Sequence, residues 1–221
     1  PGSTFKIVTF SAGIEEKVFS INETFNDPGF RMVGNARIKD WKAGGHGRQT
    51  FLEVIQNSCN PGFMEIGFRL GTEKLYNYID AFGFGEKTGI DLLGESTGIV
   101  FNVDRVGPVE LATSSFGQGN STTPIQLTSA MSACINGGNL LKPFILKSMQ
   151  NEIGDTIYET PVTIKRQVIS KETSDIMRYA LETVSALGTG RGAYAEGYLV
   201  GGKTGTAQKV GEDGHYMQGN Y

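Results

Sequence analysis

Glycine is the feature of this sequence that most constrains its fold. The 221 residues include 31 glycines, about twice the ordinary share of ~7%. They follow no repeating period, which excludes a collagen-like triple helix. Because glycine ends helices and lets backbones approach closely, we expect short helices and strands separated by many turns.

Charge and apolar content exclude several classes of protein. The formal net charge is -3 and 38% of the residues are hydrophobic, which is typical of a soluble globular domain. So balanced a charge argues against a nucleic-acid partner. No apolar run reaches the ~18 residues that a membrane-spanning helix needs. The two cysteines, Cys59 and Cys134, cannot build a disulfide scaffold.

Helices are predicted from apolar spacing together with capping residues and with Pro or Gly at their ends. Thr50 and Ser170 are identified as the capping residues of two of them. The expected helices cover residues 4–17, a short segment after Thr50, residues 61–70, 72–83 and 124–135, and the segment after Ser170.

Fewer strands are predicted. Residues 20–48 carry Gly, Asn, Asp and Pro without a clear period and are expected to form an extended loop region. Segments 140–149 and 155–160 predict a hairpin. A strand is also expected over residues 198–208, and the turn signal at 212–214 predicts that the chain then returns antiparallel.

Ser3 and Lys6 place a hydroxyl and an amine on one face of the first predicted helix, because residues i and i+3 are neighbours there. A serine needs a base to act as a nucleophile at neutral pH. A lysine can be that base only when a second cation or an apolar pocket lowers its pKa. The alternative is a helix-capping serine beside a solvated lysine, and Ser-x-x-Lys alone does not decide between them.

Two further motifs supply the missing groups. Ser58-Cys59-Asn60 follows a helix and offers a hydroxyl for a proton relay and an amide for a peptide-like substrate. Lys203-Thr204-Gly205-Thr206 lies on the predicted strand. Its lysine is the second cation, and its glycine would let a substrate backbone lie against the strand.

These short patterns also have rival interpretations. Ser20-Ile21-Asn22 repeats the Ser-x-Asn pattern, and Lys87-Thr88-Gly89 repeats the Lys-Thr-Gly pattern without a preceding strand, so we expect the latter to be a turn. Residues 197–204 match G-x-x-x-x-G-K-T, the phosphate-binding loop of nucleotide-binding proteins. That loop needs a strand before it and a helix after it, and neither is predicted here.

Taken in order, the three motifs resemble the active-site motifs of the penicillin-binding proteins and serine β-lactamases. The similarity is greatest to the monofunctional class B penicillin-binding proteins, and residues 40–47 are reminiscent of their elongation and sporulation branches. The segments that carry the resemblance are 1–6, 58–60, 116–119, 123–127 and 197–208.

This resemblance implies a mixed α/β (α+β) fold, that of a penicillin-binding or β-lactamase-like transpeptidase. Residues 1–221 would form a partial transpeptidase domain, with the helical part and the strand that carries Lys203, truncated at both ends. A pedestal domain, a membrane anchor and further C-terminal strands would belong to segments outside this chain.

The resemblance also implies a role for each motif residue. Ser3 would be the nucleophile and Lys6 its base. Ser58 and Lys203 would relay the proton. The backbone N–H groups of Ser3 and Thr206 would form the oxyanion hole. No metal and no cofactor are implied. The residues implied to bind the substrate are Asn60, Thr204, Gly205 and Thr206.

The implied activity is that of a peptidoglycan D,D-transpeptidase. Such an enzyme cross-links stem peptides that end in D-Ala-D-Ala through a serine acyl-enzyme, and β-lactam antibiotics inhibit it. Its partners would be peptidoglycan stem peptides, β-lactams and other cell-wall synthesis proteins. It would lie at the cell membrane with its catalytic domain on the outer face, and only an N-terminal segment would contact the membrane.

Alternatives of the same fold stay open. A D,D-carboxypeptidase carries the same three motifs. A serine β-lactamase of class A needs a deacylating glutamate, and no Glu-x-x-Leu-Asn occurs between the second and third motifs. A non-catalytic β-lactam sensor is a third alternative, although the intact Lys203 and Asn60 favour catalysis.

Three residues outside the motif roles could bind a metal ion. Asp40, His46 and Cys59 are of the types that bind zinc. Polar loop residues without a metal are the favoured interpretation, and no metal site is predicted.

Overall fold

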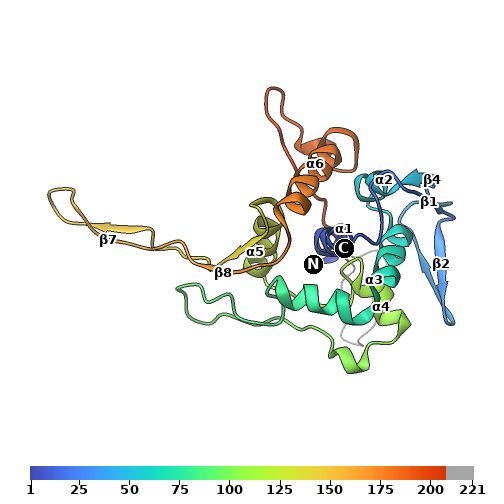
Figure 1. Ribbon diagram of the computed structural model, residues 1–221, viewed down its shortest axis with the longest axis horizontal. Coiled ribbons are helices and arrows are strands. Elements are labelled where there is room, and N and C mark those ends of the chain that lie inside the picture. The colour runs from blue at the N-terminus through green and yellow to red at the C-terminus, as the bar shows by residue number, and fades with distance from the viewer. Residues whose placement is uncertain (208–221) are drawn as a thin grey trace.

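A buried helix forms the centre of the molecule. This computed structural model describes residues 1–207, and in it α1 (Lys6–Glu15) is enclosed by α3 (Asn60–Ala81), α5 (Pro124–Ile135) and α6 (Lys171–Leu187). Figure 1 shows α1 end-on with these helices around it. Residues 6–13 are all buried, as expected for a helix that is covered on every face.

The predicted capping residues start the helices. Thr50 caps α2 (Phe51–Gln56) by accepting a hydrogen bond from the backbone N–H of Glu53, whose side chain bonds back in a capping box. Ser170 caps α6 in the same position relative to its helix. The predicted break at Gly71 is also confirmed, since its φ of 76° interrupts α3. Helix α4 (Pro108–Ser114) was not predicted.

Residues 20–48 form two small antiparallel sheets, so the prediction of an extended loop region is wrong there. Strand β1 (Thr24–Asp27) pairs with β4 (Gly47–Thr50), and β2 (Phe30–Val33) pairs with β3 (Ala36–Lys39). Each strand has four residues and buries at most one of them. Strands this short carry too few alternations to produce a period-2 pattern.

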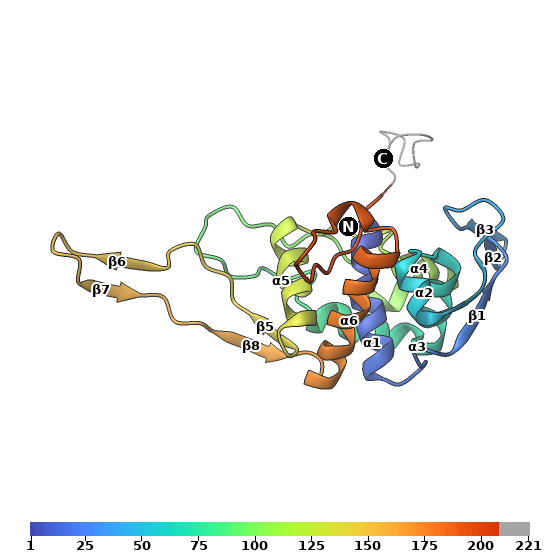
Figure 2. The same ribbon diagram turned by 90° about the horizontal axis from the view of Figure 1, so that it is seen from above.

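A long hairpin projects from the helical body. Apart from Gln150, its outer pair lies within the predicted segments 140–149 and 155–160, whereas the strand over residues 164–167 was not predicted. Strand β5 (Asn139–Leu141) pairs with β8 (Ile164–Gln167) next to α5, and β6 (Ser148–Gln150) pairs with β7 (Thr156–Glu159) further out. Figures 1 and 2 show the outer pair reaching away from all the helices.

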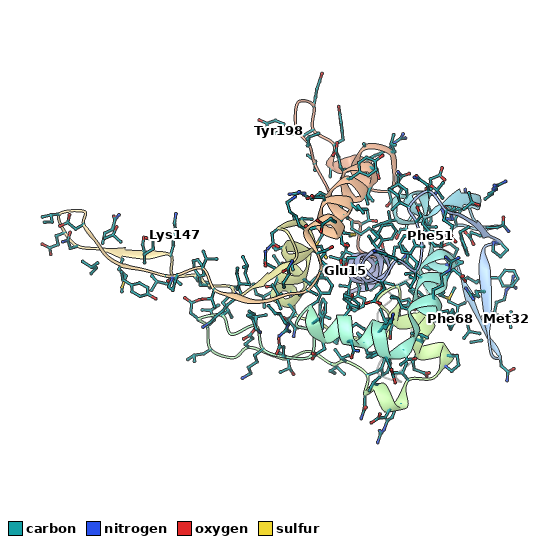
Figure 3. The ribbon with its side chains drawn as sticks, viewed as in Figure 1. Glu15, Met32, Phe51, Phe68, Lys147 and Tyr198 are labelled. Atoms are coloured by element: carbon teal, nitrogen blue, oxygen red, sulfur yellow. The ribbon has the colours of Figure 1, made fainter. Side chains whose placement is uncertain are left out.

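Aromatic side chains fill the core between α1, α2 and α3. The ring centroids of Phe10 and Phe19 lie 5.0 Å apart, and those of Phe19 and Phe51 lie 4.6 Å apart. Figure 3 shows Phe51 directed into the helical body, whereas Met32 lies at the outer edge of β2. Cys134 is fully buried in α5, as its spacing predicted. None of the described helices is both long and apolar enough to cross a membrane.

The strand predicted over residues 198–208 is not formed between residues 198 and 207. No described strand pairs with this segment, and a β-strand is defined by the ladder of hydrogen bonds to a partner. Instead, Gly202 N–H donates to the Leu181 carbonyl in α6 at 3.1 Å. Gln208 and the turn predicted at 212–214 lie outside the described residues.

Candidate active site

Ser3 and Lys6 lie on one continuous helical segment. Its first turn is a 3-10 turn, η1 (Gly2–Phe5), which leads directly into α1. The predicted helix over 4–17 is therefore confirmed in position, although its first turn is tighter than an α-helix. Lys6 is the first residue of α1 and is completely buried, while Ser3 is half-buried.

The Lys6 side chain connects the first motif to the second. Its Nζ donates to the Ser58 carbonyl oxygen at 2.7 Å, to Asn60 Oδ1 at 2.7 Å and to Ser58 Oγ at 3.1 Å. Among the described residues, no hydrogen bond joins Lys6 Nζ to Ser3 Oγ. Catalytic hydrogen bonds are often long before a substrate binds.

Burial and like charge both act against the cationic form of Lys6. Burial, and after it the charge of Lys203, lower the pKa of Lys6 well below its ordinary value. Lys6 is fully buried. The aromatic rings of Phe63 and Phe116, 5.2 and 6.0 Å from Lys6 Nζ, favour the cation, but burial outweighs this contact. This is the environment in which a lysine can act as a base.

Lys203 reaches the same hydroxyl from the third motif. Its Nζ donates to Ser58 Oγ at 2.8 Å, and burial lowers the pKa of Lys203 to about 8. Ser58 Oγ thus accepts hydrogen bonds from two lysines. Both of its lone pairs are then occupied, which leaves its own proton free to be donated.

Ser58 has a backbone conformation that glycine usually adopts. Its φ is 54°, in the left-handed region that costs L-residues energy. It follows the last turn of α2, where Ser58 N–H donates to Ile55 O at 3.2 Å and Cys59 N–H donates to Val54 O at 3.0 Å. This pair of bonds is a Schellman motif with serine at the usual glycine position.

Asn60 is held on three sides at the start of α3. Its side-chain oxygen accepts from Lys6, and its Nδ2 donates to the Lys39 carbonyl at 3.3 Å. Its backbone N–H donates to Asp40 Oδ1 at 3.0 Å. The orientation of this amide therefore depends on the segment that follows β3.

Residues 204–206 lie beside the turn that carries Ser3. A Cβ at Gly205 would lie 2.8 Å from Cγ2 of Thr4, so the absence of a side chain permits this approach. The Ser3 N–H donates to the Thr206 carbonyl at 3.4 Å. The Ser3 N–H, which is one of the two groups expected to form the oxyanion hole, is therefore hydrogen-bonded to a carbonyl oxygen of the protein in this arrangement.

Two glycines make the turn around Ser3 possible. Gly2 has a φ of 56°, and a Cβ there would collide with the Thr206 carbonyl. Gly117 has a φ of 87°, and a Cβ there would collide with the Gly2 carbonyl. Both positions also accommodate the hydrogen bond from Gly2 N–H to Gly117 O at 3.1 Å.

The structure adds Thr189, a residue for which the sequence analysis gave no role. Its hydroxyl oxygen lies 3.1 Å from Oγ1 of Thr204 and donates to the Gln56 carbonyl at 3.2 Å. In the sequence, Gly188-Thr189-Gly190 indicates only a turn. No local signal could connect it to residue 204.

The rival motif copies lie in loops and bind none of the three motifs. Thr88 N–H and Gly89 N–H donate to the carboxylate of Glu95 at 2.7 and 3.1 Å. Residues 87–89 are irregular loop that follows a turn at residues 82–85, so the predicted turn lies a few residues earlier, while the absence of a strand at 87–89 is as expected. Ser20 Oγ accepts from Asn22 N–H at 3.4 Å, which is a local loop contact.

The three candidate metal ligands converge, together with a fourth residue, Asp27. One ligand atom from each of Asp27, Asp40, His46 and Cys59 lies within 4.8 Å of the other three. The side chains of Asp27 and Asp40 are fully buried. Asp27 was not among the candidates from the sequence, because only the pairing of β1 with β4 brings it to the other three residues.

Buried negative groups of this kind are unstable without a cation. His46 Nδ1 lies 3.1 Å from Asp27 Oδ2 and 2.7 Å from Asp40 Oδ2. The contact with Asp40 is not aligned for a hydrogen bond, so Asp40 Oδ2 has no hydrogen-bond partner among the described residues.

Burial raises the pKa of Asp40. Burial, and after it the charge of Asp40, raise the pKa of the Cys59 thiol. Two carboxylates, one imidazole and one thiol are a donor set that suits zinc.

Comparison with known proteins gives consistent matches over the whole chain. The family model for the penicillin binding protein transpeptidase domain matches residues 1–221. The chain is 57% identical to stage V sporulation protein D of Bacillus subtilis, over 100% of the chain and 34% of that protein. It is 34% identical to penicillin-binding protein PbpB of Mycobacterium tuberculosis, over 95% of the chain and 32% of that protein. The chain thus spans about a third of the length of these curated relatives.

Solved structures agree in fold. The crystal structure of penicillin binding protein 3 from Mycobacterium tuberculosis, complexed with ampicillin, matches with a TM-score of 0.89 and 34% identity, covering 99% of this chain and 50% of that chain. The D,D-transpeptidase domain of a peptidoglycan glycosyltransferase from Eggerthella lenta matches with a TM-score of 0.84 and 29% identity, covering 95% and 54%. The mixed helix-and-strand fold expected from the three motifs is therefore confirmed.

Proposed function

The chain belongs to the family of penicillin-binding protein transpeptidase domains, and on that premise we propose that it is the catalytic part of a peptidoglycan D,D-transpeptidase. The enzyme cross-links stem peptides that end in D-Ala-D-Ala through an acyl-enzyme on Ser3, and β-lactams acylate the same serine. Relatives named peptidoglycan D,D-transpeptidase support this, including the one from Acinetobacter baumannii at 32% identity.

One observation carries the proposal: Ser58 Oγ lies between two lysines from different motifs. Lys6 and Lys203 approach it at 3.1 and 2.8 Å, although the two lysines are separated by most of the sequence. Such an arrangement connects a nucleophile's base to a second proton donor. A capping serine beside a solvated lysine would not require it.

The chemistry follows from this relay. Neutral Lys6 accepts the proton of Ser3 Oγ as that oxygen attacks the carbonyl carbon between the two D-Ala residues. The C–N bond then breaks, and Ser58 donates its proton to the departing D-Ala amine while the proton on Lys6 replaces it. The amine of a second stem peptide attacks the ester and reverses these transfers, which releases Ser3 and forms the cross-link.

Substrate recognition is assigned to the second and third motifs. The Asn60 amide binds the peptide backbone of the donor stem. Thr204 and Thr206 bind its terminal carboxylate, and Gly205 gives the substrate backbone access to this segment. Before the N–H groups of Ser3 and Thr206 can stabilise an oxyanion, the Thr206 carbonyl must turn away from Ser3 N–H.

Slow deacylation distinguishes this function from that of a β-lactamase. A β-lactamase needs a base that activates water after acylation. Within residues 1–207, no carboxylate hydrogen-bonds to Lys6, Ser58 or Lys203. Because no carboxylate is placed at these groups to activate water, we expect the penicilloyl ester to persist.

The surrounding protein is part of the same proposal. The chain would act within a longer protein that adds a pedestal, further strands and an N-terminal membrane anchor, with the site on the outer face of the cell membrane. Other cell-wall synthesis proteins would be its partners. The 57% identity to a sporulation protein favours the sporulation branch.

The test uses the full-length protein and benzylpenicillin. We expect intact-mass measurement and peptide mapping to show one penicilloyl group on Ser3, with an adduct that persists for many minutes, and no adduct on Ser3→Ala. With stem peptides we expect cross-linked product. Labelling that survives Ser3→Ala would overturn the assignment of the nucleophile. Rapid turnover of the drug would indicate a β-lactamase. Release of D-Ala without cross-links would indicate a carboxypeptidase. A stable adduct without any peptide product would indicate a β-lactam sensor.

A further inference from the structure

We propose that Thr189 orients the hydroxyl of Thr204 so that Thr204 donates its proton to the substrate's carboxylate. The inference rests on the proposed function, because it uses the carboxylate-binding role assigned there to Thr204. Its basis is a contact between two hydroxyls that are distant from the catalytic serine in sequence: Oγ1 of Thr189 lies 3.1 Å from Oγ1 of Thr204.

Backbone contacts hold Thr189 in place independently of its hydroxyl. Its N–H donates to the Gln56 carbonyl at 2.9 Å. The N–H groups of Gly188 and Gly190 both donate to the Val184 carbonyl, at 3.1 and 3.0 Å. Because these bonds join the ends of α2 and α6, a variant that loses only the hydroxyl should keep the same backbone.

The Thr189 hydroxyl determines where the proton of the Thr204 hydroxyl is directed. Thr204 Oγ1 already accepts a hydrogen bond from Lys203 Nζ at 3.2 Å. The single proton of Thr189 can be given either to the Gln56 carbonyl, at 3.2 Å, or to Thr204. In the first case Thr204 must give its own proton to Thr189. In the second case Thr204 accepts from both neighbours, and its proton is free for a ligand.

A bound carboxylate selects the second arrangement. An anion accepts hydrogen bonds and donates none, so it needs the Thr204 proton. Turning the Thr189 hydroxyl away from Gln56 leaves that carbonyl bonded to the Thr189 N–H at 2.9 Å, so no buried acceptor loses its only partner. Two donors on Thr204 also polarise its O–H bond and strengthen its hydrogen bond to the anion. Thr189 is thus a positioning residue that acts through Thr204.

The test compares acylation of the full-length protein by benzylpenicillin and by its methyl ester, which lacks the carboxylate charge. Thr189→Val removes the hydroxyl at nearly constant shape. For the free acid we expect its second-order acylation constant to fall about threefold to tenfold, the range of one net hydrogen bond. The drug concentration that gives half the maximal acylation rate should rise, whereas the limiting acylation rate at saturating drug should stay the same. For the ester we expect no change, and Thr189→Ser should restore the acid rate.

A double-mutant cycle shows whether Thr189 acts through Thr204. We expect Thr204→Val to lower the acid rate further than Thr189→Val, and the double variant to be no slower than Thr204→Val alone. Equal loss for acid and ester, an unchanged acid rate in Thr189→Val, or additive losses would overturn the inference while the proposed function stands. Failure of the wild-type protein to be acylated would overturn both.

Discussion

At the scale of single residues, Ser58 combines two demands that conflict. Its hydroxyl bridges the two lysines, and its carbonyl accepts from Lys6 at 2.7 Å. Its backbone, with a φ of 54°, closes the Schellman motif after α2. Glycine would suit that backbone better but has no hydroxyl. The position therefore retains a strained residue for its chemistry, as is common at functional sites.

Two substitutions separate strain from chemistry. Ser58→Gly and Ser58→Ala both remove the hydroxyl, and we expect both to abolish acylation by benzylpenicillin. Only glycine relieves the left-handed strain, so the free energy of unfolding should be about 1 kcal/mol greater for the glycine variant than for the alanine variant. Urea unfolding of both variants measures this difference. Equal stability would show that the backbone at residue 58 is not strained.

At the scale of elements, the two small sheets and α3 meet at the buried polar cluster. Asp27 ends β1, Asp40 follows β3 and His46 precedes β4, while Cys59 caps α3. Asp40 and Lys39 also accept hydrogen bonds from Asn60. A cation bound at this cluster would therefore fix the position of the second motif relative to Lys6.

We expect the protein purified without chelator to carry zinc in an about equimolar amount. Its removal, or His46→Ala, should lower the melting temperature and slow acylation, because two buried carboxylates lose their counter-charge. Metal analysis and thermal unfolding measure both effects. Cys59→Ser should reduce the zinc content, whereas Cys134→Ser, at the other buried free cysteine, is the matched control and should retain it. A metal-free wild-type protein of unchanged stability would contradict this prediction.

At the scale of the whole molecule, the site and the projecting hairpin are far apart. The three motifs meet at one end of the central helix, which α3, α5 and α6 enclose. The hairpin extends from α5 in the direction away from α1 (Figure 1). Figure 3 shows Lys147 well outside the helical body. Strands β6 and β7 pair with each other and with no other described strand. The hairpin is thus separate from the core that positions the site.

Replacing residues 148–159 by a short glycine-containing turn should therefore leave acylation nearly unaffected. We expect the acylation constant of the full-length protein to stay within about twofold of wild type, which corresponds to less than about 0.5 kcal/mol in the barrier. The control is a similar shortening of β2 and β3, whose end carries the carbonyl that accepts from Asn60; it should slow acylation strongly. A large loss in the first variant would show that the hairpin supports the site.

The sequence alone determined where several helices start and which residues form the three motifs, although it did not indicate α4. Thr50 and Ser170 could be identified as caps because capping depends on residues three positions apart. The pairing of Ser58 with Lys6 and Lys203 was also expected, but only because three motifs in order matched a known family. Single motifs, such as Ser-x-x-Lys, were too common to identify the site.

Tertiary structure alone decided the rest, because the remaining contacts join segments that are distant in sequence. Asp27 reaches Cys59 only through the pairing of β1 with β4, and strands of four residues leave no readable period. Thr189 reaches Thr204 only because the ends of α2 and α6 are hydrogen-bonded together. Residues 198–200 begin a segment that was expected to form a strand, yet a strand also needs a partner at hydrogen-bonding distance. Helix propensity and capping depend on neighbouring residues and can therefore be read from the sequence. Contacts between distant segments form only when the chain folds.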